Sequence, residues 1–258
     1  MIKSLNYPIS TGWITCPQPN PQARLRLFCF PYAGASASIF RNWSNKLPPD
    51  IEVCAVQLPG REQRLREPLF TQLNPLIDTL VEALLPYLDL PFAFFGHSLG
   101  AIICFELARQ LRRQKYLTPL HLFVSGRRAP QIPDLQPIHQ LPKALFIEQL
   151  RRYNGTPEAV LQNNELMELL LPILRADLAI NETYRYQSEA PLDCSLSAFG
   201  GLQDRKVSCY ELELWREHTN SSFSLDMFSG DHFFLKTELN SLLQLISSHL
   251  VKYCYVKN

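Results

Sequence analysis

Residues 92–100, Phe-Ala-Phe-Phe-Gly-His-Ser-Leu-Gly, join a short apolar run to the pattern G-x-S-x-G around Ser98. The run is typical of a buried strand, and residues 99–113 have the pattern of a helix. A serine at a sharp strand-to-helix turn has a strained backbone, and Gly96 and Gly100 leave the room that this turn needs. Such a nucleophile elbow presents the hydroxyl beside a backbone N–H and a helix N-terminus. Ser98 is therefore the candidate nucleophile, the alternative being a serine in a tight surface turn.

Apolar runs and helix-length segments alternate along the rest of the chain. The spacing predicts strands over residues 24–30, 51–58, 91–95, 120–125, 194–199 and 222–228, and helices over 73–87, 99–113 and 238–252. Buried strands separated by helices predict an α/β fold with a mostly parallel central sheet, flanked by helices on both faces. A ligand of such a sheet binds beyond the carboxyl ends of its strands.

Residues 139–190 interrupt this alternation, because they contain only helical patterns, over 141–152 and 163–186. We interpret this insertion as a helical lid over the site, although it could simply belong to the body. The chain of 258 residues fits one domain spanning residues 1–258, with a proline-containing linker over 15–22.

Composition excludes several classes of protein. The formal net charge of +1 argues against a nucleic-acid binder that works by neutralising phosphates. No stretch approaches the length of a membrane span, and residues 1–8 lack the apolar core of a signal peptide. We therefore expect a cytoplasmic protein that contacts neither nucleic acid nor membrane.

The seven cysteines are scattered and form no C-x-x-C pair, which favours buried thiols in a reducing compartment. The sequence contains no metal-ligand spacing and no phosphate-cradling loop. We expect neither a metal nor a cofactor.

A serine nucleophile needs a base, and His232 has the best position among the six histidines. It follows the strand expected at 222–228, in the segment Gly230-Asp231-His232. In hydrolases whose nucleophile elbow has the G-x-S-x-G pattern, the three catalytic residues follow along the chain in the order serine, acid, histidine. The remaining histidines lie in strands, helices or the insertion; they are His97, His121, His139, His218 and His249.

The acid that orients the base is predicted from position as well. Asp204 directly follows the strand expected at 194–199, so it lies at the carboxyl end of the sheet. Asp231 is a distant second choice, because adjacent side chains rarely form a good base–orienter hydrogen bond. The oxyanion hole should use the N–H of Leu99 and an N–H of the loop 31–37, which contains small residues.

Seven motifs together resemble the type II thioesterases, the free-standing editing enzymes of nonribosomal peptide and polyketide synthesis, within the α/β-hydrolase superfamily. The motifs are Phe30-Pro31-Tyr32-Ala33-Gly34, Gln57-Leu58-Pro59-Gly60-Arg61-Glu62, Phe95-Gly96-His97-Ser98-Leu99-Gly100, Ser125-Gly126-Arg127-Arg128-Ala129-Pro130, Leu174-Arg175-Ala176-Asp177 with Glu182-Thr183-Tyr184, Gly200-Gly201-x-x-Asp204 and Gly230-Asp231-His232-Phe233-Phe234.

The resemblance implies hydrolysis of acyl and aminoacyl thioesters on the phosphopantetheine arm of carrier-protein domains, which regenerates misprimed synthases. It implies Ser98 as nucleophile, His232 as base, Asp204 as orienting acid, and the amides of Ala33 and Leu99 as the oxyanion hole. The enzyme needs no cofactor of its own, and we expect a monomer. Asp231 stands where many relatives have glycine.

Other functions remain open at this point. The related medium-chain fatty acyl-carrier thioesterase shares the scheme, and a general carboxylesterase or lipase shares the fold. A macrocyclising thioesterase domain and a catalytically inactive scaffold are two further alternatives. The carrier-type motifs argue against the esterase, and the intact Ser, Asp and His set argues against the scaffold.

Overall fold

The computed structural model describes residues 12–134 and 137–255, and its centre is a seven-stranded sheet. The strands are β1 (Ile14–Thr15), β2 (Leu25–Phe30), β3 (Ile51–Val56), β4 (Phe92–His97), β5 (His121–Ser125), β6 (Ser195–Gly201) and β7 (Phe223–Phe228). They lie in the order β1-β3-β2-β4-β5-β6-β7, and every neighbouring pair is parallel except β1 with β3. The predicted α/β fold with a mostly parallel sheet is confirmed.

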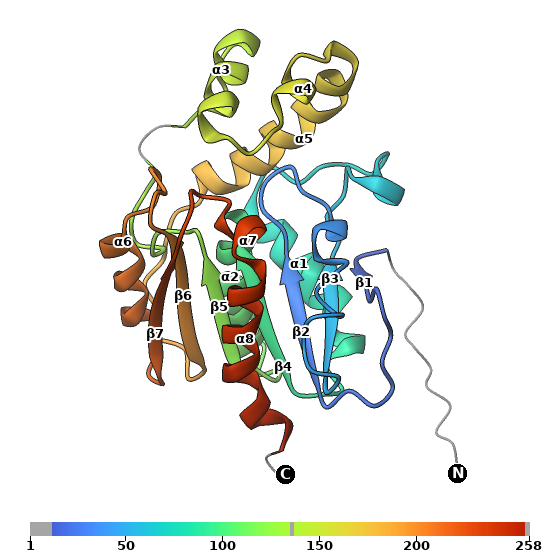
Figure 1. The fold of residues 1–258 in the computed structure, drawn as a ribbon, viewed down its shortest axis with the longest axis vertical. Coiled ribbons are helices and arrows are strands. Elements are labelled where there is room, and N and C mark those ends of the chain that lie inside the picture. The colour runs from blue at the N-terminus through green and yellow to red at the C-terminus, as the bar shows by residue number, and fades with distance from the viewer. Residues whose placement is uncertain (1–11, 135–136, 256–258) are drawn as a thin grey trace.

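Helices cover both faces of the sheet (Figure 1). Helices α1 (Leu73–Leu84) and α2 (Leu99–Arg113) pack on one face, and α8 (Leu239–Cys254) packs on the other. Strand β2 shows how one sequence serves two cores. Phe28 and Phe30 belong to the core under α1 and α2, whereas Leu25 and Leu27 belong to the core under α8. Side chains alternate between the faces of a strand, so a strand in the middle of the sheet is apolar on both faces, and the one charged residue of β2, Arg26, is paired with Glu52.

Most predicted elements appear within a few residues of their expected ends, and the differences have local causes. Helix α1 ends at Leu84 and continues as a 3₁₀ turn, η3 (Leu85–Tyr87), because Pro86 lacks the N–H that an α-helix requires. Strand β1 was not predicted, and its second residue, Thr15, is the first residue of the predicted linker over 15–22. Helix α6 (Cys209–Glu213) was also missed, although a capping box between Ser208 and Glu211 marks its first turn.

As predicted, the segment 139–190 contains helices and no strand. The helices expected over 141–152 and 163–186 correspond to α3 (Lys143–Tyr153) and α5 (Asn164–Thr183), and α4 (Glu158–Leu161) between them was not predicted. We call these three helices the cap. In Figure 1 the cap stands above one end of the sheet. Its inward side chains form a small core of their own: Ile138, Phe146, Leu150, Leu161, Met167, Leu171 and Leu174. The expected single domain includes residues 1–11 and 256–258, which lie outside the described residues. Residues 1–8, predicted not to be a signal peptide, are among them.

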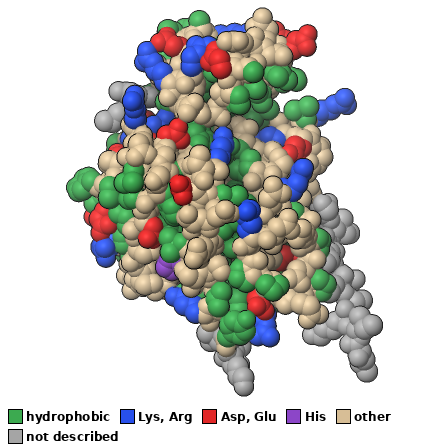
Figure 2. Space-filling view, viewed as in Figure 1, with side chains coloured by type: hydrophobic (Ala, Val, Ile, Leu, Met, Phe, Trp, Pro, Cys, Tyr) green, Lys and Arg blue, Asp and Glu red, His purple; other side chains and the backbone are tan. Residues whose placement is uncertain are grey.

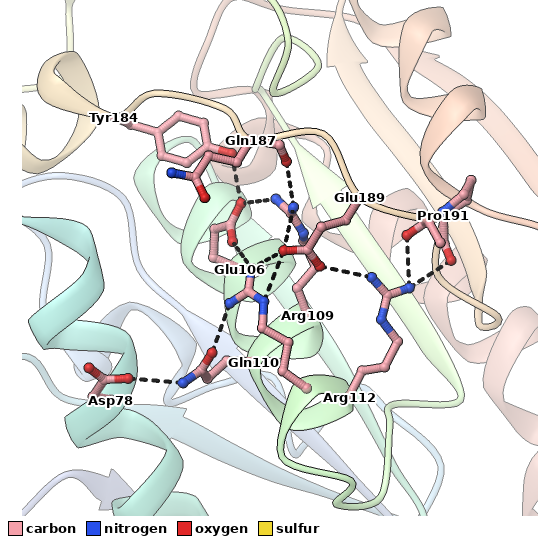
Figure 3. Close-up of polar contacts among 11 residues, drawn as sticks. Asp78, Glu106, Arg109, Gln110, Arg112, Tyr184, Gln187, Glu189 and Pro191 are labelled. Atoms are coloured by element: carbon pink, nitrogen blue, oxygen red, sulfur yellow. Dashed lines mark hydrogen bonds and ion pairs between the residues drawn. The ribbon is translucent and has the colours of Figure 1, made fainter.

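The chain that leaves the cap, residues 184–191, is fastened to α2 by polar contacts (Figure 3). The Tyr184 hydroxyl donates to Glu106 at 2.7 Å, and Arg112 donates to the carbonyls of Ala190 and Pro191 at 2.8 and 2.7 Å. Glu189 pairs with arginines of the same helix. Because α2 begins next to Ser98, the exit of the cap is tied to the helix that carries the candidate nucleophile.

Lys and Arg side chains are interspersed with Asp and Glu over the cap and the body on the face that Figure 2 shows. Within residues 12–134 and 137–255, no helix has both the length and the apolar character needed to cross a bilayer.

Two buried histidines should make the fold sensitive to acid. Burial lowers the pKa of His121 from 6.5 to about 3 and that of His218 from 6.5 to about 4. Between pH 6.5 and 4 the unfolded chain therefore binds more protons than the folded chain at these sites, so the free energy of unfolding falls as pH falls. We expect His218→Gln to reduce this slope by up to about 1.4 kcal/mol per pH unit, measured by urea unfolding at several pH values. If the free energy of unfolding changed with pH equally in the variant and in the wild type, the prediction would be contradicted.

Candidate active site

Ser98 occupies the sharp turn between β4 and α2. Its backbone has φ 55° and ψ −110°, a conformation that residues other than glycine rarely adopt. The two glycines of the motif make the turn possible. A Cβ on Gly96 would lie 2.1 Å from the carbonyl oxygen of Gly100, and a Cβ on Gly100 would lie 2.1 Å from that of Phe30. Both neighbours are backbone atoms that cannot move aside, so the first turn of α2 sits directly on the end of β2.

His232 and Asp204 meet at the carboxyl end of the sheet. Asp204 lies in the loop after β6, and His232 lies in the loop after β7. The Nδ1 atom of His232 is 2.7 Å from Oδ2 of Asp204, whose side chain is fully buried. Since a carboxylate only accepts, Nδ1 carries the proton and Nε2 is left as the basic nitrogen. The other carboxylate oxygen of Asp204 accepts the backbone N–H of Lys206 at 2.8 Å, which fixes the direction of the acid.

The rival acid, Asp231, has other partners. Its carboxylate accepts from the amide of Asn154 at 2.9 Å and from the backbone N–H of Phe233 at 2.8 Å. These contacts hold Asp231 against the cap and its own loop. Of the two aspartates weighed from the sequence, the structure pairs Asp204 with the Nδ1 atom of His232.

Ser98 and His232 line one cavity of about 70 Å³ together with Ala33. Its remaining walls come largely from the cap and from aromatic residues of the neighbouring loops: Tyr32, Leu150, Tyr153, Gly155, Thr156, Leu174, Leu178, Lys206 and Phe233. Leu99 is the first residue of α2, so its N–H has no acceptor within the helix. The structure thus gathers the predicted nucleophile, base and oxyanion loop around one space beneath the cap.

A second, larger groove of about 910 Å³ runs beside this cavity and shares Tyr153, Lys206 and His232 with it. Basic side chains outnumber acidic ones along it. The charged lining residues are Arg128, Arg152, Arg205 and Lys206, with Asp134, Asp204 and Asp231. The groove thus carries charges of both signs close to the Asp204–His232 pair, and most of its positive charge comes from the three arginines.

Lys206 is a site residue that the sequence analysis missed. Burial lowers the pKa of its ammonium to about 7, against the opposing effect of the Asp204 and Asp134 carboxylates. Its Nζ lies over the ring of Tyr153, a cap residue. The only sequence signal was its place two residues after Asp204, and the aromatic partner is 53 residues away in the chain.

His97, the residue before Ser98, is buried beneath the site. Its Nδ1 lies 2.9 Å from the hydroxyl of Ser125, and its ring centroid is 5.2 Å from that of His232. Burial holds the pKa of His97 well below its usual value, so this ring is neutral and packs beside His232.

Among the described residues, one group has donor atoms close enough to hold a metal ion: Cys16, Glu52 and Cys54, within 4.8 Å of one another. The Glu52 carboxylate already accepts from Arg26 and from the backbone of Asn20, at 2.7 and 2.8 Å. The group lies on the edge of the sheet, at β1 and β3. The absence of a metal and of a cofactor stays a prediction from the sequence.

Comparison with known proteins identifies the family. The model of the thioesterase domain matches residues 25–250. The chain belongs to the thioesterase family. It is 50% identical over 245 residues to linear gramicidin dehydrogenase LgrE of Brevibacillus parabrevis, covering 93% of both chains. It is 48% identical over 239 residues to the gramicidin S biosynthesis protein GrsT of Aneurinibacillus migulanus, covering 92% of this chain and 93% of that protein.

Solved structures agree with this membership. The type II thioesterase BorB from the borrelidin biosynthetic cluster superposes with a TM-score of 0.85 at 36% identity, over 94% of this chain and 99% of that chain. Although the name of LgrE contains the word dehydrogenase, the G-x-S-x-G turn of the present chain is a motif of hydrolases. The protein is a thioester hydrolase of the serine type.

The alternative function in fatty-acid synthesis corresponds to a more distant relative. The medium-chain S-acyl fatty acid synthase thioesterase of Rattus norvegicus is 35% identical over 231 residues, covering 86% of both chains.

The contact between Gly100 and Phe30 gives a test of the turn. Replacing a helical glycine by alanine ordinarily stabilises a protein by about 1 kcal/mol. For Gly100→Ala we expect a loss of about 3 kcal/mol, because the new methyl group meets a backbone carbonyl at 2.1 Å. Urea unfolding measures the loss. In the control Gly155→Ala, the methyl group meets the Phe233 ring, which can rotate away. A stabilised Gly100→Ala variant would contradict this close approach.

Proposed function

We propose that this thioesterase hydrolyses acyl and aminoacyl thioesters on the phosphopantetheine arm of carrier-protein domains. By doing so it removes misprimed groups during nonribosomal peptide or polyketide synthesis. The observation that carries the proposal is that His232, bonded to Asp204, lines one capped cavity with Ser98, in a chain close in sequence to a gramicidin S biosynthesis protein.

The proposed mechanism uses three side chains and two amides. His232 Nε2 accepts the proton of the Ser98 hydroxyl as its oxygen attacks the thioester carbonyl. Asp204 keeps the imidazole oriented and stabilises its positive charge. The N–H groups of Ala33 and Leu99 stabilise the negative oxygen. The carbon–sulfur bond then breaks, the pantetheine sulfur takes the proton from His232, and an acyl-serine remains.

Water completes the cycle. His232, neutral again, removes a proton from a water molecule that attacks the acyl-serine, and it returns that proton to the Ser98 oxygen as the acid product leaves. A thiolate is a good leaving group, so the first half of the reaction needs less assistance from the acid than peptide cleavage does.

We further propose that the cap acts as a lid and that the larger groove beside the cavity admits the pantetheine arm. Leu150, Leu174 and Leu178 of the cap line the cavity of about 70 Å³, which is far below the roughly 300–1,000 Å³ of pockets that enclose drug-sized ligands. With the cap in this position the cavity suits short acyl groups rather than medium chains. Arg128 and Arg205 along the groove match the negative phosphate of the arm.

A monomer in the cytoplasm is also part of the proposal. The seven cysteines lie within the described residues and form no disulfide, which fits a reducing compartment. Light scattering of the purified protein tests the monomer.

The proposal is tested with a panel of acyl- and aminoacyl-carrier proteins, assayed with the wild type and with Ser98→Ala. We expect the wild type to release the acyl groups, and Ser98→Ala to fold normally yet lose this hydrolysis. A simple nitrophenyl ester serves as the comparison. Turnover of that ester above turnover of the carriers would favour a general esterase. A cyclic product would favour a macrocyclising enzyme, and failure of Ser98 to react with a fluorophosphonate would favour an inactive scaffold.

The choice of acid has its own prediction. Asp204→Asn should lower kcat by about 10⁴-fold, because the amide favours the wrong tautomer of His232. Asp231→Asn is the matched control, since its carboxylate contacts Asn154 and Phe233 instead, and its kcat should stay close to that of the wild type. If Asp231→Asn proved the more damaging change, the assignment of Asp204 would be wrong.

A further inference from the structure

A buried ion pair joins the cap to the body. Asp177 lies on α5 of the cap, and Arg61 lies in the loop between β3 and η2 (Glu62–Arg64). The guanidinium of Arg61 donates to Oδ2 of Asp177, and the two side chains are only 5% and 3% exposed. Arg61 also donates to the Pro59 carbonyl at 2.6 Å, which anchors it to its own loop. Charges this deeply buried persist only where they are well paired.

The same two side chains hold the loop that follows β2. The backbone N–H of Gly34 donates to Oδ2 of Asp177 at 2.7 Å. The carbonyl of Ala35 accepts from Nε of Arg61 at 2.9 Å. This loop therefore has one anchor on the cap and one on the body.

The anchor on the cap acts directly beside Ala33. The Gly34 N–H belongs to the rigid peptide unit that also contains the Ala33 carbonyl. Fixing that unit leaves only the two backbone torsions of Ala33 to decide where the Ala33 N–H points. Helix α5 also presses on this spot, because a Cβ on Gly34 would lie 2.5 Å from the Leu174 side chain. Leu174 and Ala33 line the same cavity as Ser98.

We propose that Asp177 is a positioning residue, which holds the Ala33 loop in its oxyanion-binding conformation only while the cap is seated. Seating of the cap and assembly of the oxyanion hole then become a single event, and a substrate that leaves the cap displaced is turned over slowly. The inference rests on the proposed function in one respect, namely the role of the Ala33 amide as an oxyanion donor.

The test compares Asp177→Ala and Asp177→Asn with a matched control, Glu52→Gln. Glu52 and Arg26 form another buried pair, with side chains 1% and 8% exposed, on β3 and β2 near the opposite end of the sheet from Ser98. The measurements are kcat and KM on a short acyl thioester, inhibition by a boronic acid that forms a tetrahedral adduct with Ser98, and urea unfolding.

For Asp177→Ala we expect kcat to fall by about 10²-fold, the effect of losing one oxyanion donor, with KM within about three-fold of the wild type. The boronic acid should bind about 10²-fold more weakly, because its adduct places an oxygen where the oxyanion forms. Asp177→Asn keeps an acceptor for the Gly34 N–H but loses the negative charge that anchors this acceptor to Arg61, so its losses should be smaller, about five-fold in boronic acid affinity. Glu52→Gln should lose stability and keep kcat.

The control Glu52→Gln shows what the loss of a buried ion pair does to stability alone. The inference is overturned if Asp177→Ala is destabilised as Glu52→Gln is, and its kcat and its affinity for the boronic acid stay within about three-fold of the values for Glu52→Gln. Should Asp177→Ala fail to fold, Asp177→Asn decides. Boronic acid binding about five-fold weaker than in the wild type supports the inference, and unchanged binding overturns it. The boronic acid assay needs no carrier protein, so failure of the wild type on acyl carriers would count against the proposed function and leave this test intact.

Discussion

The contact between the first turn of α2 and the end of β2 is the constraint on which the site depends. Gly100 lies so close to the Phe30 carbonyl that a single methyl group would collide with it. This approach forces the chain to reverse at Ser98 with a positive φ. The strain is maintained because the flanking strand and helix are both buried in the main core. The candidate nucleophile is thus placed by backbone packing, which leaves the Ser98 side chain available for chemistry.

The remaining groups reach Ser98 because the strands run in parallel. Each loop that follows a strand opens at the same end of the sheet, so Asp204 after β6 and His232 after β7 become neighbours although they are 28 residues apart. The loop after β2 arrives at the same end with Ala33. The cap lies in the chain between β5 and β6 and covers this end of the sheet, as Figure 1 shows.

The cap has a core of its own, yet polar contacts fasten it to the body at several places. Two of them are the Asp177–Arg61 pair at the Ala33 loop and the network between residues 184–191 and α2 in Figure 3. Buried polar contacts are costly unless they are complete, so they favour one seated position of the cap over a range of loosely packed ones. Apolar packing alone would specify that position less sharply.

The sequence by itself determined six of the seven strands, the long helices that flank the sheet and the candidate residues of the site, whereas it missed β1, α4 and α6. Residues 92–95 of strand β4 are all apolar, and the glycines at 96 and 100 make room for the turn at Ser98, so local pattern was enough for these elements. Chain order was enough to select Asp204 and His232. Only the tertiary structure decided what surrounds them: the contact of Lys206 with Tyr153, the engagement of Asp231 by Asn154, and the hold of Asp177 on Gly34. These partners are 53 to 143 residues apart, and no local pattern specifies which distant side chain will face a given loop once the cap has packed onto the body.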